Sequence, residues 1–267
     1  MSIADYESRG HAMSERERLA GGGLNEVLRQ DATVLRPLGP WSDTVHRLLA
    51  HLRAKGFMLS PSFHGVTEDG LEILDYLPGV IGGYPITSDA SSTAALVSAA
   101  QVLRALHDAT ASFLLGPTDV WALPPQSPYE VICHNDFGPH NCVLGGGEVI
   151  GVIDFDLAGP GPRIWDIAYA LYRWAPMSAV PAANANSAVA EQAVRVQQFC
   201  DAYGLDDGSR ARVVDATIAR LRGLLTFMGA EAERGNEAFA RMLIQGHDII
   251  YERDIAYIEM HRRAFSL

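Results

Sequence analysis

The most informative stretch of this chain is His134-Asn135-Asp136-Phe137-Gly138-Pro139-His140-Asn141, followed by Val152-Ile153-Asp154-Phe155-Asp156. The two segments place a carboxylate, an amide and a second carboxylate at spacings that suit magnesium-assisted phosphoryl transfer. Asp136 is predicted to orient an acceptor hydroxyl and to take its proton late in the reaction. Asn141 and Asp154 offer the hard oxygen ligands that Mg²⁺ prefers.

The spacing of these residues predicts one preorganised loop followed by a hairpin. Gly138 and Pro139 bend and stiffen the loop, and the turn Gly145-Gly146-Gly147 folds Asp154 back beside Asn141. A His-x-Asp-x4-Asn pattern alone arises by chance in on the order of one chain in a few tens. The interpretation therefore depends also on the following hairpin and on the preceding helix with Leu106-His107.

The composition is that of a folded, water-soluble protein. Of the 267 residues, 48% are apolar and 20% are charged, which argues against extensive disorder. The length allows one large domain or two lobes. The formal net charge of −11 should repel nucleic acid and anionic membranes and attract cationic small molecules. We expect neither a nucleic-acid nor a membrane partner, and no oligomeric state is predicted.

The cysteines and the termini favour a cytoplasmic location. Cys133, Cys142 and Cys200 include no Cys-x-x-Cys pair, so we expect reduced thiols packed in the interior. Residues 1–18 are polar and carry no apolar run of the kind found in signal peptides. No later segment has the apolar length that spans a bilayer.

The first third of the chain is predicted to be β-rich with one helix. Strands at 26–29 and 33–36 are expected to form a hairpin, and Ser42 or Asp43 should cap a helix that ends near Gly56. A strand pair follows, with Glu68-Asp69-Gly70 as its turn. We expect a polar segment at 1–18, a nucleotide-binding lobe at 19–78, and at 79–267 a helical lobe with the catalytic loop and acceptor pocket.

The remaining two thirds are predicted to be mainly helical. A helix should begin near Ser92, short strands follow from Val131, and residues 165–174 read as a second helix. A later helix is indicated by a buried stripe of apolar residues, namely Val214, Ile218, Leu221, Leu225 and Met228.

Several of these motifs together resemble a known family. They are Gly21-Gly22-x-x-Asn25, Val34-Leu35-Arg36, Leu74-Asp75-Tyr76-Leu77-Pro78-Gly79, Leu103-x-x-Leu106-His107, His134-x-Asp136-x4-Asn141, Ile153-Asp154-Phe155-Asp156 and Trp165-Asp166-Ile167-Ala168. Over residues 20–260 the chain resembles the aminoglycoside phosphotransferase and choline kinase-like family. The resemblance implies an α+β, bilobal, protein-kinase-like fold with a small β-rich N-lobe, a larger helical C-lobe, and ATP or GTP between them.

The resemblance also implies roles for residues of the N-lobe. Gly22, Gly23 and Asn25 would cover the nucleotide phosphates, although a flexible linker would contain the same glycines. Arg36 would face the α- and β-phosphates, and a surface arginine before Pro37 would look the same. Asp75, Tyr76 and Leu77 would form the hinge that meets the base, and would equally suit a core strand.

Other residues would support the catalytic loop. His134 is expected to pack within the loop, and Asp166 to accept hydrogen bonds from it. Asp156 is either a second carboxylate near the metal or a turn former. One position departs from the family: Val45 stands where a helix glutamate usually pairs with the basic strand residue. The ion pair that would hold Arg36 in place is therefore expected to be missing.

Two functions follow from these residues. The first is a magnesium-dependent small-molecule kinase, of the kind that confers antibiotic resistance, acting on a hydroxyl of a cationic acceptor such as an aminoglycoside or amino alcohol. The cationic charge is inferred from acidic residues of the helical half, which a solvated helix face would also explain. They are Glu231, Glu233, Glu237, Asp248, Glu252, Asp254 and Glu259. The second is a weakly catalytic or inactive kinase-like protein that confers tolerance to a toxin.

Overall fold

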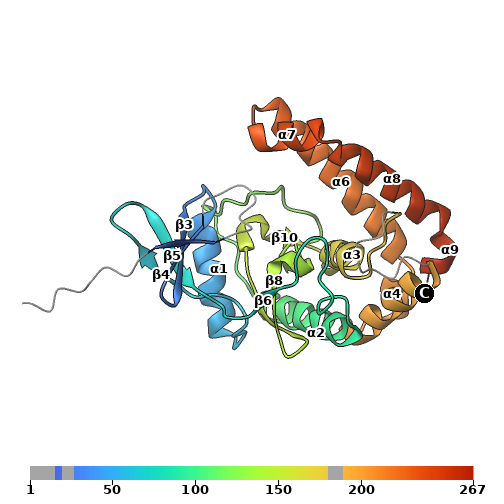
Figure 1. Ribbon diagram of the computed structural model, residues 1–267, viewed down its shortest axis with the longest axis horizontal. Helices are drawn as coiled ribbons and strands as arrows, with labels where there is room; N and C mark the ends of the chain where they lie inside the picture. The colour runs from blue at the N-terminus through green and yellow to red at the C-terminus, as the bar shows by residue number, and fades with distance from the viewer. Residues whose placement is uncertain (1–15, 20–26, 180–188, 267) are drawn as a thin grey trace, which may run out of the picture. The chain divides into compact units, whose positions relative to one another are not determined.

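The computed structural model describes residues 16–19, 27–179 and 189–266. These residues form two compact units, one containing residues up to Leu38 together with Phe63–Tyr76, the other Gly39–Ser62 and Leu77 onward. Most of the expected N-terminal segment and the glycine-rich loop with Gly22, Gly23 and Asn25 lie outside the described residues. The predicted order, a smaller β-rich part and a larger helical part, is confirmed (Figure 1).

The first unit is a five-stranded antiparallel sheet. Its strands are β1 (Glu17–Arg18), β2 (Leu28–Gln30), β3 (Thr33–Pro37), β4 (Phe63–Val66) and β5 (Leu71–Asp75), in the order β1-β2-β3-β5-β4. The predicted hairpin is present, and its turn contains Asp31 in the left-handed region (φ 55°). Gly70 ends the next turn with φ 81°, a conformation that costs glycine little. Leu35 and Leu74 are buried.

Helix α1 (Ser42–Ala54) groups with the second unit. The expected boundary after residue 78 assigned it to the N-lobe, but its contacts lie elsewhere. Thr44 Oγ1 accepts a hydrogen bond from Val120 N at 3.0 Å, and Arg47 Nη1 donates to Leu114 O at 2.8 Å. The predicted cap is wrong in detail: Ser42 lies inside the helix, and its Oγ accepts from Gly39 N at 2.9 Å. The helix ends before Gly56, as predicted.

Short strands and one long helix position the catalytic loop in the second unit. Strands β6 (Val80–Ile81), β8 (Cys142–Gly145) and β9 (Glu148–Val152) form one sheet, and β7 (Val131–Cys133) pairs with β10 (Gly159–Gly161). Helix α2 (Thr93–Thr110) is capped by Ser92, whose Oγ accepts from Ala95 N at 3.1 Å. It contacts β7 and β9. The loop between β7 and β8 therefore starts and ends on buried elements.

The remaining described elements of the second unit are helices, and they confirm the helical prediction. They are α3 (Arg163–Trp174), α4 (Val189–Tyr203), α5 (Asp207–Arg210), α6 (Val213–Glu233), α7 (Glu237–Ile244), α8 (His247–Met260) and α9 (Arg262–Phe265). α6 and α8 run side by side, and α7 lies at their far end (Figure 1). The predicted stripe on α6 is buried except at Leu225, which is half-buried.

Candidate active site

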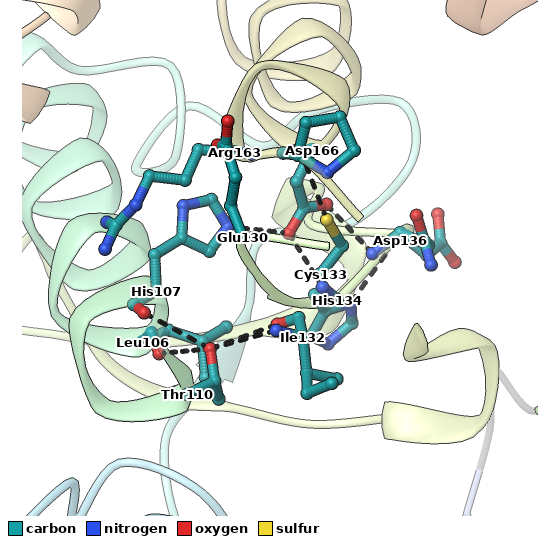
Figure 2. A network of polar contacts seen from close by, with 12 residues as sticks. Leu106, His107, Thr110, Glu130, Ile132, Cys133, His134, Asp136, Arg163 and Asp166 are labelled. Carbon is teal, nitrogen blue, oxygen red and sulfur yellow. Dashed lines mark hydrogen bonds and ion pairs between the residues drawn. The ribbon is translucent and has the colours of Figure 1, made fainter. Parts of the chain in front are cut away.

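Asp166 on α3 anchors the first residues of the catalytic loop. Its two oxygens accept hydrogen bonds from His134 N at 2.7 Å and from Asn135 N at 2.8 Å. His107 Nε2 lies 3.0 Å from Asp166 Oδ2, and Figure 2 shows the Asp166 side chain meeting His134 at the end of β7. Residues that lie far apart in the sequence thus set the position at which the loop begins.

The Asp166 carboxyl is inaccessible to solvent, and hydrogen bonds from three partners favour its ionised form. Burial acts to raise the pKa of this carboxyl, but the hydrogen bond from His107 and the nearby His134 hold it below its ordinary value. His107 Nδ1 in turn lies 2.7 Å from the Tyr203 hydroxyl. A buried chain of polar groups therefore supports the loop, as burial of a charge requires.

The backbone of the loop is held in an uncommon conformation at Asn135. This residue has φ 64°, which non-glycine residues adopt at a cost of roughly 1–2 kcal/mol. Its Nδ2 donates to Leu157 O at 2.9 Å, and its carbonyl accepts from Arg220 Nη2 at 2.7 Å. His134 Nε2 lies 3.0 Å from Ile153 O. These contacts from three other segments offset the backbone cost and fix the direction of Asp136.

Asp136 is held by two neighbours within its own loop. Asn141 Nδ2 donates to Asp136 Oδ2 at 2.9 Å and to its carbonyl at 3.1 Å, and His140 Nε2 lies 3.2 Å from Oδ1. Burial raises the pKa of Asp136, but the hydrogen bond and charge of His140 and a hydrogen bond from Tyr169 bring it below its ordinary value. The side chain is 23% exposed, so an ionised carboxylate remains within reach of a ligand.

Asp154 is brought to Asn141 by the end of β9. Ile153 N donates to Asn141 O at 3.0 Å, and Asp154 follows in the left-handed region with φ 63°. Asn141 donates to Asp136 through its Nδ2, which leaves its Oδ1 available to accept a contact from a ligand. An amide oxygen and an adjacent exposed carboxylate are hard donors that fit Mg²⁺, which takes few protein ligands alongside phosphates and water. Asp156 lies two residues on, half-buried in the short 3-10 helix Phe155–Leu157.

The described residues proposed to bind nucleotide lie apart from this loop in the sequence. Arg36 and Asp75 are strand residues of the first unit, Tyr76 directly follows β5, and Leu77 begins the next part of the second unit. Asp75 Oδ1 pairs with His64 Nε2 at 2.6 Å. The Arg29 guanidinium lies 4.0 Å from the centre of the Tyr76 ring. These contacts order the strand end that precedes Leu77.

Arg36 has a carboxylate partner on the neighbouring strand β5, which the sequence analysis did not identify. Its Nε donates to Glu72 Oε1 at 2.5 Å, because β3 and β5 pair antiparallel with Arg36 directly opposite Glu72. The Glu72 side chain is almost completely buried. Val45, at the position of the family's helix glutamate, is a core residue of α1. The sheet therefore supplies the partner that the helix lacks.

Replacing Glu72 by Gln should destabilise the protein. A buried hydrogen bond to a charged group contributes about 1.5–3 kcal/mol, and the variant keeps the size of the side chain while removing its charge. The free energy of unfolding from urea titration measures this loss. Glu68→Gln, at an exposed position in the turn between β4 and β5, is the matched control. Equal stabilities of the two variants would show that the ion pair contributes nothing.

Sequence reasoning missed Glu72, His107 and Arg220 as supports of the site. The role of Glu72 could have been found from the sequence. Once β3 and β5 are paired in register, Glu72 lies directly opposite Arg36, and opposite charges at such positions attract. His107 was noted only as part of the Leu106-His107 motif. Arg220 carries no local signal, since its contact with Asn135 O joins residues 85 positions apart.

Three of the seven acidic residues that predicted a cationic acceptor have partners within the helical half. Glu231 Oε1 binds Arg234 at 2.7 Å, and Glu259 Oε1 binds Arg222 at 3.0 Å. Asp254 accepts hydrogen bonds from the Tyr172 hydroxyl at 2.7 Å and from Ala179 N at 3.2 Å. These carboxylates are used within the helical half. Their number alone is a weak guide to the charge of an acceptor.

A β-rich unit, a helical unit and a loop with Asp136 and Asn141 anchored by a buried aspartate define a kinase-like protein. Residues 117–203 match the model of the "Phosphotransferase enzyme family". The chain is also 34% identical over 214 residues to a trifolitoxin immunity protein from Rhizobium leguminosarum bv. trifolii, covering 77% of this chain and 80% of that one. The chain belongs to the same family as this relative, and its residues 117–203 are the part that matches the phosphotransferase model.

Solved structures of small-molecule kinases share the fold. A putative aminoglycoside phosphotransferase from Ralstonia eutropha JMP134 superimposes with a TM-score of 0.62 at 16% identity, covering 94% of each chain. The amicoumacin kinase hAmiN, solved with AMP-PNP, Ca²⁺ and its ligand, gives a TM-score of 0.62 at 14% identity, covering 85% of this chain and 87% of that one. At these identities the likeness establishes the kinase-like fold alone. No helix among the described residues is long and apolar enough to cross a membrane.

Proposed function

We propose that this protein is a kinase that transfers the γ-phosphoryl group of ATP or GTP to a hydroxyl of a small molecule. The observation that carries the proposal is the Asp136 carboxyl, which is partly exposed and accepts a hydrogen bond from Asn141 Nδ2 at 2.9 Å. Asp136 and Asn141 lie on one loop, and Asp154 follows Ile153, whose N donates to Asn141 O at 3.0 Å. This is the set of groups that phosphoryl transfer needs from a protein.

Each residue of the loop has a distinct role in the proposal. Asp136 accepts a hydrogen bond from the acceptor hydroxyl and aims its oxygen at the γ-phosphorus. As the new oxygen–phosphorus bond forms and the bond to the nucleoside diphosphate breaks, the hydroxyl proton passes to Asp136. Asn141 Oδ1 and Asp154 would hold Mg²⁺, which neutralises phosphate oxygens when bound. Arg36, held by Glu72, would contact the phosphates, and Asp75, Tyr76 and Leu77 the base.

The location and partners follow from the same chemistry. The three cysteines are buried, free thiols, which persist in a reducing compartment that also supplies nucleotide triphosphates. We place the protein in the cytoplasm, with the nucleotide and a hydroxylated small molecule as its partners. The formal charge of −11 disfavours nucleic acid and anionic lipid.

The test is thermal stabilisation by ATP and GTP with and without Mg²⁺, followed by magnesium-dependent nucleotide turnover with a panel of hydroxylated compounds. Asp154→Ala should lose the magnesium-dependent part of the stabilisation, because one of two protein ligands is removed. Asp215→Ala, at an exposed ion pair with Arg262, is the matched control and should behave as the wild type. If neither nucleotide raises the melting temperature of the wild type in the presence of magnesium, the kinase proposal is wrong.

A second candidate is a weakly catalytic or inactive binding protein that confers tolerance to a toxin. It is favoured by the 34% identity to a protein named for trifolitoxin immunity. The panel described above separates the two functions. If ATP or GTP stabilises the protein and is turned over, the kinase function is supported. If neither nucleotide binds and neither is turned over, the binding function is supported. The acidic residues of α6 to α8 do not decide the charge of the acceptor, since Glu231, Asp254 and Glu259 have partners within the helical half.

A further inference from the structure

Arg173 is an arginine surrounded by tyrosines. It lies on α3, and the centre of its guanidinium group is 4.1 Å from the ring centre of Tyr84, 5.7 Å from Tyr172 and 5.9 Å from Tyr169. Within the described parts of the chain it makes these ring contacts but no hydrogen bond or ion pair. A guanidinium carries five N–H donors. Ring faces offer it electrostatic attraction but leave those donors for a ligand.

This arginine borders the loop that carries Asp136. A methyl group added at Gly138 would lie 3.4 Å from Arg173 Cγ, so the stem of the arginine runs along the loop. Tyr169, one turn earlier on α3, lies near enough to Asp136 to lower the pKa of that carboxyl. Gly82, in the segment that leads to Tyr84, packs against Pro139 so closely that a methyl group there would lie 2.5 Å from its carbonyl oxygen. All of these residues belong to the second unit.

Two tyrosine hydroxyls beside Arg173 are also without a hydrogen bond among the described residues, those of Tyr84 and Tyr251. Tyr84 is 69% exposed, and Tyr251 on α8 lies 6.2 Å, ring centre to ring centre, from Tyr172. Unpaired hydroxyls and a guanidinium together form a group of donors. The ligand that matches a group of donors is an anion with several acceptor oxygens.

The charges around this group disfavour an amine. Arg220 is a second arginine without a described carboxylate partner: its Nη2 donates to Asn135 O, its Nε is buried without a partner, and its guanidinium lies 4.8 Å from the Tyr169 ring centre. Two carboxylates act on these tyrosines: Asp136, which the proposed transfer reaction uses, and Asp254, which already accepts bonds from Tyr172 and Ala179. A cationic acceptor group at this place would meet two arginines.

We propose that Arg173, with the hydroxyls of Tyr84 and Tyr251, forms a subsite for a carboxylate of the acceptor. The substrate is then a compound that carries both a hydroxyl and a carboxylate, such as a hydroxy acid, a hydroxyl-bearing amino acid derivative or a short peptide. The inference rests on the proposed kinase function, since it names the acceptor of that reaction. Arg173 binds the carboxylate, and the adjacent Asp136 meets the hydroxyl.

The test is the binding of matched compounds in the absence of nucleotide, measured by calorimetry and thermal shift. The panel contains N-acetylserine, N-acetylthreonine and 3-hydroxybutyrate, the neutral amide of each, and ethanolamine as the cation. We expect at least one carboxylate compound to bind the wild type, and its amide to bind about 10- to 100-fold more weakly, the loss of one charged hydrogen-bonded contact.

Variants assign the effect to the subsite. Arg173→Met should lose the preference for carboxylate over amide, and Arg173→Lys should keep part of it. Tyr251→Phe, which removes one hydroxyl and keeps the ring, should weaken carboxylate binding even if Arg173→Met does not fold. Arg222→Met, at an arginine that is 64% exposed and paired with Glu259, is the control and should bind as the wild type.

The proposal is overturned if no carboxylate compound binds, if the amides bind equally well, if ethanolamine alone binds, or if Arg173→Met or Tyr251→Phe binds carboxylates as the wild type does. Nucleotide stabilisation measured on the same samples keeps the two proposals separate. A protein that binds ATP with magnesium but not the carboxylates remains a kinase with another acceptor. A protein that binds the carboxylates but not the nucleotides retains the subsite and loses the kinase function.

Discussion

Asp136→Asn is expected to reduce magnesium-dependent nucleotide turnover by about 10²–10⁴-fold, the range for losing a positioned general base. An amide cannot take the hydroxyl proton, while its shape and its contact with Asn141 can be kept. Because Asp136 is not proposed to hold the nucleotide, stabilisation by ATP with magnesium should persist. The measurements are initial rates of nucleoside diphosphate release and the melting temperature with and without nucleotide.

Asp215→Asn is the matched control for this substitution, since Asp215 is 70% exposed and pairs with Arg262 on the surface. Its turnover should equal that of the wild type. Equal turnover in the wild type and Asp136→Asn would remove Asp136 from the catalytic role. Loss of nucleotide stabilisation in Asp136→Asn would instead show that this aspartate acts in nucleotide or metal binding.

Asp166→Ala is expected to destabilise the protein by about 3–5 kcal/mol, as breaking a buried ionic pair does. The substitution leaves His107 and the backbone N–H groups of His134 and Asn135 without their shared acceptor. Urea titration measures the loss. Asp108→Ala serves as control, because Asp108 is 49% exposed and its pairs with Arg104 and Arg163 lie on the surface; it should cost less than about 1 kcal/mol.

The stability contributed by Asp166 should depend on pH in a definite direction. The pKa of this carboxyl is lowered in the folded protein: burial opposes the ionised form, but His107 and His134 outweigh it. A lowered folded pKa stabilises the protein above the unfolded pKa, which is about 4, and this stabilisation is lost as pH falls through the folded value. The stability difference between wild type and Asp166→Ala should therefore shrink below about pH 4. A difference that stays constant from pH 7 to pH 3 would contradict an ionised Asp166.

Most of the local structure was predictable because it depends on neighbouring residues. Turn residues such as Glu68-Asp69-Gly70 indicate a hairpin. The start of α2 is indicated by Ser92, whose side chain caps the helix. The start of α1 was misjudged by one position because Ser42 binds back to Gly39 instead of capping the helix. Helix α1 was expected in the first lobe, but it groups with the second unit, where it contacts residues 114–120. The order of elements along the chain does not reveal such contacts.

Some features of the candidate site could likewise be predicted from neighbouring residues, and others depend on contacts between distant parts of the chain. The spacing from Asp136 to Asn141 to Asp154 follows from a short loop and a hairpin, so their approach could be predicted. The partner of Arg36 could not be taken from the family pattern, because Glu72 reaches it through strand pairing rather than from a helix. The charge of the acceptor was inferred from the number of acidic residues, whereas the contacts of Glu231, Asp254 and Glu259 show that number to be a poor guide.

The sequence by itself determined the family and the β-rich and helical order of the chain, and it predicted the functional residues of the loop from His134 to Asn141, because these are recorded in short motifs and local periodicity. Only the tertiary structure decided which charges are paired and which are not. Arg36 and Glu72 meet across a sheet, Arg220 reaches Asn135 from a distant helix, and Arg173 stands among tyrosines without a described carboxylate. Ion pairing depends on distances of a few ångströms between side chains, and those distances are set by packing between elements that the linear sequence does not place together.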